Sequence, residues 1–190
     1  MAWDYVYKLV LVGDQTLSNV LYRQLTTSAN STLDLIVQLG VQIGTREFCF
    51  PDGVMAATQV WNLNSCDKLF EEISPFYCLD ATILVVAIDP SRPIPSIREN
   101  FTKLAWFLNA GVFKHLKVLS IYIPSDIVSF GRQDLRTFEN AVYEELGRNQ
   151  ISEIQAGMIH LAIAPATASG LLAEELLFDI RDTFPLIIAV

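Results

Sequence analysis

Three short apolar runs, separated by segments with helical periodicity, constrain the fold of this chain most strongly. The runs are ATILVVAI (81–88), KVLSIYI (117–123) and GMIHLAIA (157–164), and each is bounded by turn residues. Runs of this kind are typical of strands that are buried on both faces of a parallel sheet. Residues 97–108 and 135–146, which lie between the runs, repeat apolar positions at the period of a helix. This alternation predicts an α/β fold, with a mostly parallel sheet and helices on both of its faces.

A turn in the first half of the chain adds one antiparallel strand. Two strand-like runs, 33–50 and 54–63, flank the tripeptide Pro51-Asp52-Gly53. Proline presets a negative φ and glycine supplies a positive one, so this tripeptide favours a hairpin. With a first strand that ends at Gly13, we expect a six-stranded sheet with one antiparallel strand, in a single domain that spans residues 1–190.

Composition and charge exclude several classes of protein. Hydrophobic residues make up 52% of the chain and the formal net charge is −8. No apolar run approaches the roughly 18 residues of a membrane span, and the N-terminus has no signal-peptide pattern. Three cysteines without metal-ligand spacing favour a reducing compartment, and the acidic charge argues against nucleic acid or anionic lipid as a ligand. We therefore expect no membrane span. The high apolar content predicts more surface to bury than one core needs, so we expect protein partners. Because the chain is acidic, these partners should be neutral or basic.

The first strand and helix have the frame of a phosphate-binding loop without its binding groups. The apolar run that ends at Gly13-Asp14 is followed by a polar turn and a helical segment from Asn19. In the pattern G-x-x-x-x-G-K-[ST], the second glycine, the lysine and the hydroxyl correspond here to Ser18, Asn19 and Val20. An amide has no positive charge and an isopropyl group cannot ligate Mg²⁺, so we interpret the segment as a phosphate loop kept only for its shape. Gly13 and Asp14 leave two interpretations open, an anion site built from backbone amides and an ordinary turn.

The middle of the chain resembles the Rab branch of the Ras-superfamily small GTPases. Residues 51–88 are similar, without gaps, to the Rab order of turn, strand, W-D-T-A-G-Q-E, helix, aromatic pair and buried strand. Trp61 matches the tryptophan that precedes the second switch region, and Phe76 and Tyr77 match the aromatic pair. Residues 39–43, LGVQI, are similar to the first switch region, although the spacing to Pro51 is one residue too long. The resemblance covers nearly the whole chain and implies a Ras-like P-loop fold.

The residues that this family uses for nucleotide binding are replaced. Asn62 and Ser65 stand at the aspartate and glycine of D-x-x-G, and Cys66 stands where the family has the glutamine that positions the attacking water. Of the guanine motif N-K-x-D only Asp126 is kept, and a lone aspartate after a strand is more often a turn or cap residue. The family's switch threonine would fall near Gln38.

Two further positions depart from the family. The S-A-K motif after the last strand becomes Thr167-Ala168-Ser169, and the chain ends in PLIIAV, so no lipid anchor is expected. At least four interactions with charged groups, at about 1.5 to 3 kcal/mol each, are lost, a total on the order of 6 to 12 kcal/mol. We therefore expect no tight binding of GTP, GDP or Mg²⁺, no other cofactor and no GTP hydrolysis.

The resemblance also suggests where a protein partner would bind. Ile43, Trp61, Leu69, Phe76 and Tyr77 correspond to the aromatic and apolar surface on which Rab effectors dock, although these side chains could equally pack between the central strands and the switch helix.

Three functions remain open from the sequence. The first is a catalytically inactive, Rab-like pseudo-GTPase that acts as a constitutive scaffold subunit in a large cytoplasmic complex, in trafficking or at the cilium or cytoskeleton. The second is an atypical small GTPase that binds nucleotide weakly and regulates vesicle or ciliary trafficking. The third is an enzyme of another class, for which the sequence offers no paired base and nucleophile.

Overall fold

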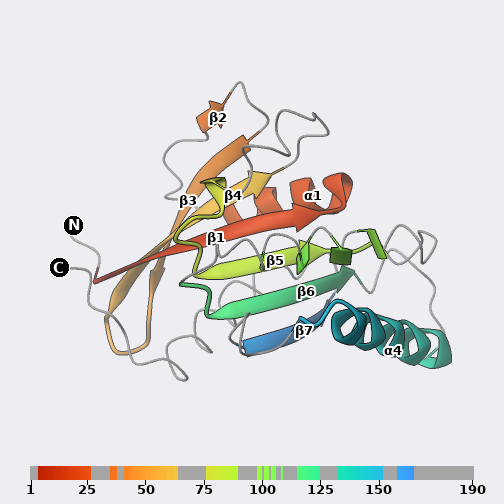
Figure 1. Ribbon diagram of the computed structural model, residues 1–190. Helices are drawn as coiled ribbons and strands as arrows, with labels where there is room; N and C mark the ends of the chain where they lie inside the picture. The colour runs from red at the N-terminus through yellow and green to blue at the C-terminus, as the bar shows by residue number, and fades with distance from the viewer. Residues whose placement is uncertain are drawn as a thin grey trace.

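A seven-stranded mixed sheet forms the centre of the computed structural model (Figure 1). The structure describes residues 4–26, 35–37, 41–63, 76–89, 98–99, 101–102, 104–105, 108, 115–124, 132–151 and 158–164. The strands lie in the order β2-β3-β4-β1-β5-β6-β7. Their bounds are β1 Tyr5–Gly13, β2 Leu35–Val37, β3 Val41–Cys49, β4 Met55–Leu63, β5 Ile83–Ala87, β6 Val118–Pro124 and β7 Met158–Ala164. Two helices are described over their full length, α1 Gln15–Thr26 and α4 Arg132–Arg148.

The α/β class and the mixed sheet agree with the prediction. Strands β4, β1, β5, β6 and β7 are parallel to one another, and β3 runs antiparallel to both of its neighbours. The sheet has one strand more than expected, because the run 33–50 contributes two strands. β2 and β3 are separated by residues 38–40, and they pair with each other.

The predicted hairpin joins β3 to β4. Phe50 and Val54 close it through a backbone hydrogen bond of 2.8 Å, and Gly53 has a φ of +85°, the positive value that the turn needs from a glycine. The turn fixes the register of the pair, so that Cys49 lies opposite Met55 at one end and Val41 lies opposite Leu63 at the other.

Alternate side chains of the central strands are buried on opposite faces of the sheet. On one face, Leu9, Leu11 and Ile83 pack against the apolar side of α1, which presents residues at helical spacing: Leu17, Leu21, Tyr22 and Leu25. On the other face, Val10, Leu84 and Val86 belong to the cluster that contains Val142 and Leu146 of α4 and the helical residues Phe101, Leu104, Ala105 and Leu108. All five residues of β5 are buried, as expected for a central parallel strand.

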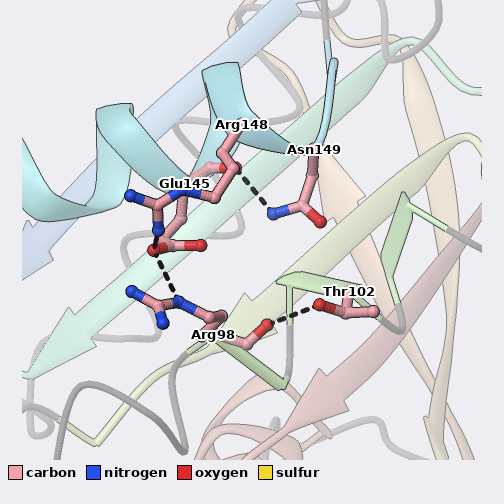
Figure 2. A network of polar contacts seen from close by, with 5 residues as sticks. All are labelled: Arg98, Thr102, Glu145, Arg148 and Asn149. Carbon is pink, nitrogen blue, oxygen red and sulfur yellow. Dashed lines mark hydrogen bonds and ion pairs between the residues drawn. The ribbon is translucent and has the colours of Figure 1, made fainter.

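A buried carboxylate links α4 to the helical residues near position 98 (Figure 2). Glu145 is 4% exposed, and its Oε1 accepts hydrogen bonds from Arg98 Nε at 3.1 Å and from Arg148 Nη1. Asn149 Nδ2 donates to the Glu145 carbonyl oxygen at 2.8 Å, and Thr102 Oγ1 donates to the Arg98 carbonyl oxygen at 3.0 Å. The carboxylate therefore joins two residues that are 47 positions apart in the sequence.

In the part of the chain that the structure describes, every helix is too short or too polar to cross a membrane.

Candidate functional site

The turn between β1 and α1 lies where the direction of chain winding reverses. β1 has β4 on one side and β5 on the other, so its carboxyl end is the switch point at which ligands bind in open α/β sheets. Gly13 ends β1 with a φ of +105°, and the Asp14 N–H donates to the Ala87 carbonyl oxygen of β5 at 2.8 Å. A Cβ on Gly13 would lie 2.2 Å from the Ala87 oxygen, so the two strands approach closely at this point. A side chain at position 13 would not fit.

Asp14 caps α1 with its own carboxylate. Its Oδ1 accepts the backbone N–H groups of Thr16 at 2.9 Å and Leu17 at 3.1 Å, and the residue is buried. These are the free amides of the first helical turn, the groups that bind an anion at the start of a helix. Because the carboxylate already accepts from both of them, the geometry favours the ordinary turn with a helix cap over an anion site at Gly13 and Asp14.

Ser18, Asn19 and Val20 lie within α1 and not in a loop. The helix begins at Gln15, so a single residue, Asp14, separates it from β1. Ser18 is buried, and its Oγ donates to the Gln15 carbonyl oxygen at 3.2 Å. The prediction that this segment keeps the shape of a phosphate loop is therefore wrong, because the cap at Asp14 starts the helix four residues earlier than the motif places it.

An amide cluster of Asn19, Gln42 and Asn62 joins three elements near this turn. Asn62 of β4 is fully buried, and its Nδ2 donates to Asn19 Oδ1 of α1 at 3.1 Å and to Gln42 Oε1 of β3 at 2.9 Å. Both hydrogens of the Asn62 amide are thus used. Its Oδ1 is buried and has no hydrogen-bond partner among the described residues.

A second group of side chains gathers around Trp61 on the opposite face of β4. Ile43 of β3 lies beside Trp61 in the antiparallel register, and the rings of Trp61 and Tyr77 have centroids 6.1 Å apart. Lys8 Nζ lies 4.1 Å from the centroid of the Trp61 ring and donates to the Leu79 carbonyl oxygen at 2.7 Å. Burial lowers the pKa of Lys8.

Phe76, next to Tyr77, is 69% exposed, and it is among the four large hydrophobic residues that the described part of the chain exposes. We call Ile43, Trp61, Phe76, Tyr77 and Lys8 the Trp61 surface. Four of the five residues suggested as a partner surface thus belong to one region of the molecule: Ile43 is beside Trp61, the Tyr77 ring lies near it at an interplanar angle of 41°, and Phe76 is next to Tyr77 in the chain. Leu69 lies outside the described residues.

Two of the predicted nucleotide positions, Ser65 and Asp126, are also outside the described residues, and so are Cys66 at the glutamine position and Gln38 near the switch threonine. The same holds for the segment 167–169. The described members of the predicted nucleotide set are Gly13, Asp14, Ser18, Asn19, Val20 and Asn62. Among these, Asn19 and Asn62 are joined by a hydrogen bond, and Asp14 and Ser18 are joined by a backbone hydrogen bond of 2.9 Å.

Sequence reasoning missed Gln42 and Lys8. Gln42 alternates with Val41 and Ile43 along β3, so a period of two predicts that its side chain faces the other side of the sheet from theirs. Lys8 is the only charged residue in the apolar run of the first strand, which indicates a cation with a specific partner.

Comparison of the sequence with models of protein families and with curated proteins finds no match.

Proposed function

We propose that this protein is a Rab-like pseudo-GTPase with a Ras-like fold, which binds no nucleotide tightly and acts as a constitutive protein-interaction subunit of an intracellular complex. The observation that carries this proposal is the Asp14 carboxylate bound to the Thr16 and Leu17 amides. A phosphate would have to displace an anion that belongs to the protein itself, at the point where the family places its phosphate loop.

The sheet supports the choice of fold. The parallel strands β4-β1-β5-β6-β7 form a doubly wound arrangement whose switch point is at β1, and β3 adds an antiparallel strand beside β4. The turn at Gly13 and Asp14 lies at that switch point, which is also where the resemblance puts the nucleotide.

Electrostatics at the start of α1 argue against a triphosphate. The lysine position is occupied by Asn19 and the metal-orienting aspartate position by Asn62, and these two neutral side chains are hydrogen-bonded to each other. A ligand with several negative charges would meet the Asp14 carboxylate and no described cation in this cluster. Like charges at close range in a poorly solvated site are costly, at several kcal/mol for a pair about 4 Å apart.

The Trp61 surface supports a role in protein binding. Aromatic side chains are enriched at protein interfaces, and in this surface Phe76 is largely exposed while Trp61 and Tyr77 are partly buried. The net charge of −8 favours a partner that is neutral or basic. The scaffold role, the cytoplasmic location and the place in trafficking or at the cilium come from the resemblance.

Calorimetry with GTP and GDP tests the nucleotide part of the proposal. Protein that has been unfolded, stripped of ligand and refolded should show no saturable heat with either nucleotide and Mg²⁺ at concentrations up to about 1 mM, which corresponds to a binding free energy weaker than about −4 kcal/mol. Saturable binding in the low micromolar range would contradict the proposal. Nucleotide retained through purification would favour the atypical GTPase instead.

Purification from the native cells tests the interaction part. A partner should co-purify in stoichiometric amount with the unmodified protein and be lost with Phe76→Ser. Tyr143→Ser is the matched control, since Tyr143 lies on α4 and is 56% exposed, so that neither substitution removes a core side chain. An isolated monomer, or equal retention of the partner by both variants, would contradict a binding role for the Trp61 surface.

A further inference from the structure

The amide cluster connects the three segments that, by the resemblance, a bound nucleotide would connect. Asn19 stands at the lysine position, Asn62 stands at the aspartate of D-x-x-G, and Gln42 belongs to the stretch that is similar to the first switch region. Here Asn62 Nδ2 bridges the other two, at 3.1 Å to Asn19 Oδ1 and at 2.9 Å to Gln42 Oε1. The protein's own amides therefore make a link for which a GTPase needs a ligand.

The donor of the bridge is shielded from water, whereas the acceptor residues Asn19 and Gln42 are partly exposed. Asn62 is fully buried, so solvent does not compete for the two hydrogens that it donates. The buried Asn62 amide would keep the free-energy penalty of desolvation if it lost its two acceptors, so opening the bridge is unfavourable.

A second contact holds β3 to α1 nearby. A Cβ built on Gly44 would lie 2.5 Å from Thr26 Cγ2 and 3.0 Å from the Tyr22 hydroxyl, so the strand backbone lies directly against the helix. β3 is thus fixed to α1 at two places, by close packing at Gly44 and by the amide bridge at Gln42.

The bridge also fixes residues on the other face of the sheet. Trp61 precedes Asn62 in β4 and Ile43 follows Gln42 in β3, and Ile43 and Trp61 lie side by side in the register. Since successive side chains of a strand point to opposite faces, a bridge that holds Gln42 to Asn62 on one face holds Ile43 to Trp61 on the other.

We propose that the amide cluster is a permanent clasp, which holds β3 against α1 and β4 without a ligand and so keeps the Trp61 surface in one arrangement. This inference deepens the proposed function and rests on it for the meaning of that surface. A GTPase orders such segments only while the third phosphate is bound. The clasp removes that dependence, so the surface is always presented.

Hydrogen exchange measured by mass spectrometry tests the clasp. In Asn62→Leu, which keeps the volume and removes the donor, amides of β3 should exchange about tenfold faster than in the unmodified protein, as expected from the loss of two partly buried hydrogen bonds. Rates are compared with those of β5, because a global loss of stability accelerates both strands whereas local opening accelerates β3 alone.

Thr58→Val is the matched control. Thr58 is on the same strand, is also buried, and its Oγ1 has no hydrogen-bond partner among the described residues, so its replacement removes no bridge and should leave β3 exchange unchanged.

Gln42→Met gives a second and milder test from the side of β3. It removes one of the two bridges and should accelerate β3 exchange, and the double variant with Asn62→Leu should exchange no faster than Asn62→Leu alone. β3 exchange in Asn62→Leu equal to that of the unmodified protein, or fully additive effects in the double variant, would overturn the clasp and leave the proposed function standing. Slower β3 exchange of the unmodified protein with GTP and Mg²⁺ would overturn the ligand independence and the proposed function together.

Discussion

Replacing Gly13 by alanine should destabilise the protein strongly, because two costs add at this position. A residue with a side chain at a φ of +105° is strained by about 1 to 3 kcal/mol. The new Cβ would also lie 2.2 Å from the Ala87 carbonyl oxygen, and that oxygen cannot move away without weakening its hydrogen bond to the Asp14 N–H. Overpacking of this kind costs about 1 to 3 kcal/mol more. The expected loss is about 2 to 6 kcal/mol, a large part of the roughly 5 to 15 kcal/mol by which domains are stable.

Gly53→Ala is the control, since it isolates the strain from the collision. Gly53 has a φ of +85°, but a Cβ there meets nothing within 4 Å, so only the backbone strain should lower the free energy of unfolding. Urea unfolding followed by far-ultraviolet circular dichroism measures both variants. With a slope of about 2 kcal/mol per molar, the Gly13 variant should unfold at a midpoint lower than that of the Gly53 variant by about 0.5 to 1.5 M. Equal midpoints would refute the conclusion that β1 and β5 leave no room for a side chain at Gly13.

Three further predictions concern single side chains. Asp14→Ala should lower the free energy of unfolding by about 1 to 2 kcal/mol through loss of the cap, and Asp14→Asn should recover most of it in the same urea assay; equal losses would mean that the cap contributes little. Glu145→Ala should lower the free energy of unfolding by about 2 kcal/mol, less than the loss of one partner of a fully buried ion pair would, since both arginine partners are about half exposed. No change in the urea midpoint would show that the network does not contribute to stability. Burial raises the pKa of Cys78 to about 12, so the stability that its neutral thiol contributes is present below about pH 9 and is lost as the pH rises toward 12. At about pH 8.5, iodoacetamide should alkylate the exposed Cys49 in the native protein and leave Cys78 unmodified, which peptide mass mapping would check.

Periodicity located the regular elements because it depends on residues that are close in the sequence. The apolar run 81–88 contains β5 and the run 117–123 corresponds to β6, which continues to Pro124. The helical pattern at 135–146 lies inside α4. A strand that is buried on both faces and a helix with one apolar side each leave a local pattern, so neither requires knowledge of its neighbours.

The start of α1 was misplaced because a motif was given more weight than the local pattern. Leu17, Leu21 and Leu25 follow one another at the spacing of four residues that α1 buries, and Asp14 stands where a cap residue would start such a helix. Matching the segment to a phosphate loop placed Ser18 in the loop and started the helix at Asn19 instead. The helix signal was present in the sequence, and the capping rule would have found it.

Half of the amide cluster could have been predicted from the sequence. The turn at 51–53 sets the hairpin register, which pairs Cys49 with Met55 and, seven residues further along each strand, Gln42 with Asn62. The contribution of Asn19 could not be predicted in this way. It depends on how α1 crosses the sheet, and that is decided by tertiary packing such as the close approach of the helix to Gly44.

The neutral character of the amide cluster follows from the same burial that makes it strong. A lysine at position 19 and a carboxylate at position 62 would pair with each other, but the free-energy cost of removing two charges from water can exceed what their mutual attraction returns. Two asparagines have donors and acceptors without charge, so Asn62 can bind Asn19 and Gln42 directly and no ligand is needed for balance. The Asp14 carboxylate is stable for a related reason, since the amides and dipole of α1 bind it. On the proposed function, Asn19 and Asn62 stand in place of nucleotide-binding groups, and these same two residues let this end of the sheet pack as an ordinary interior.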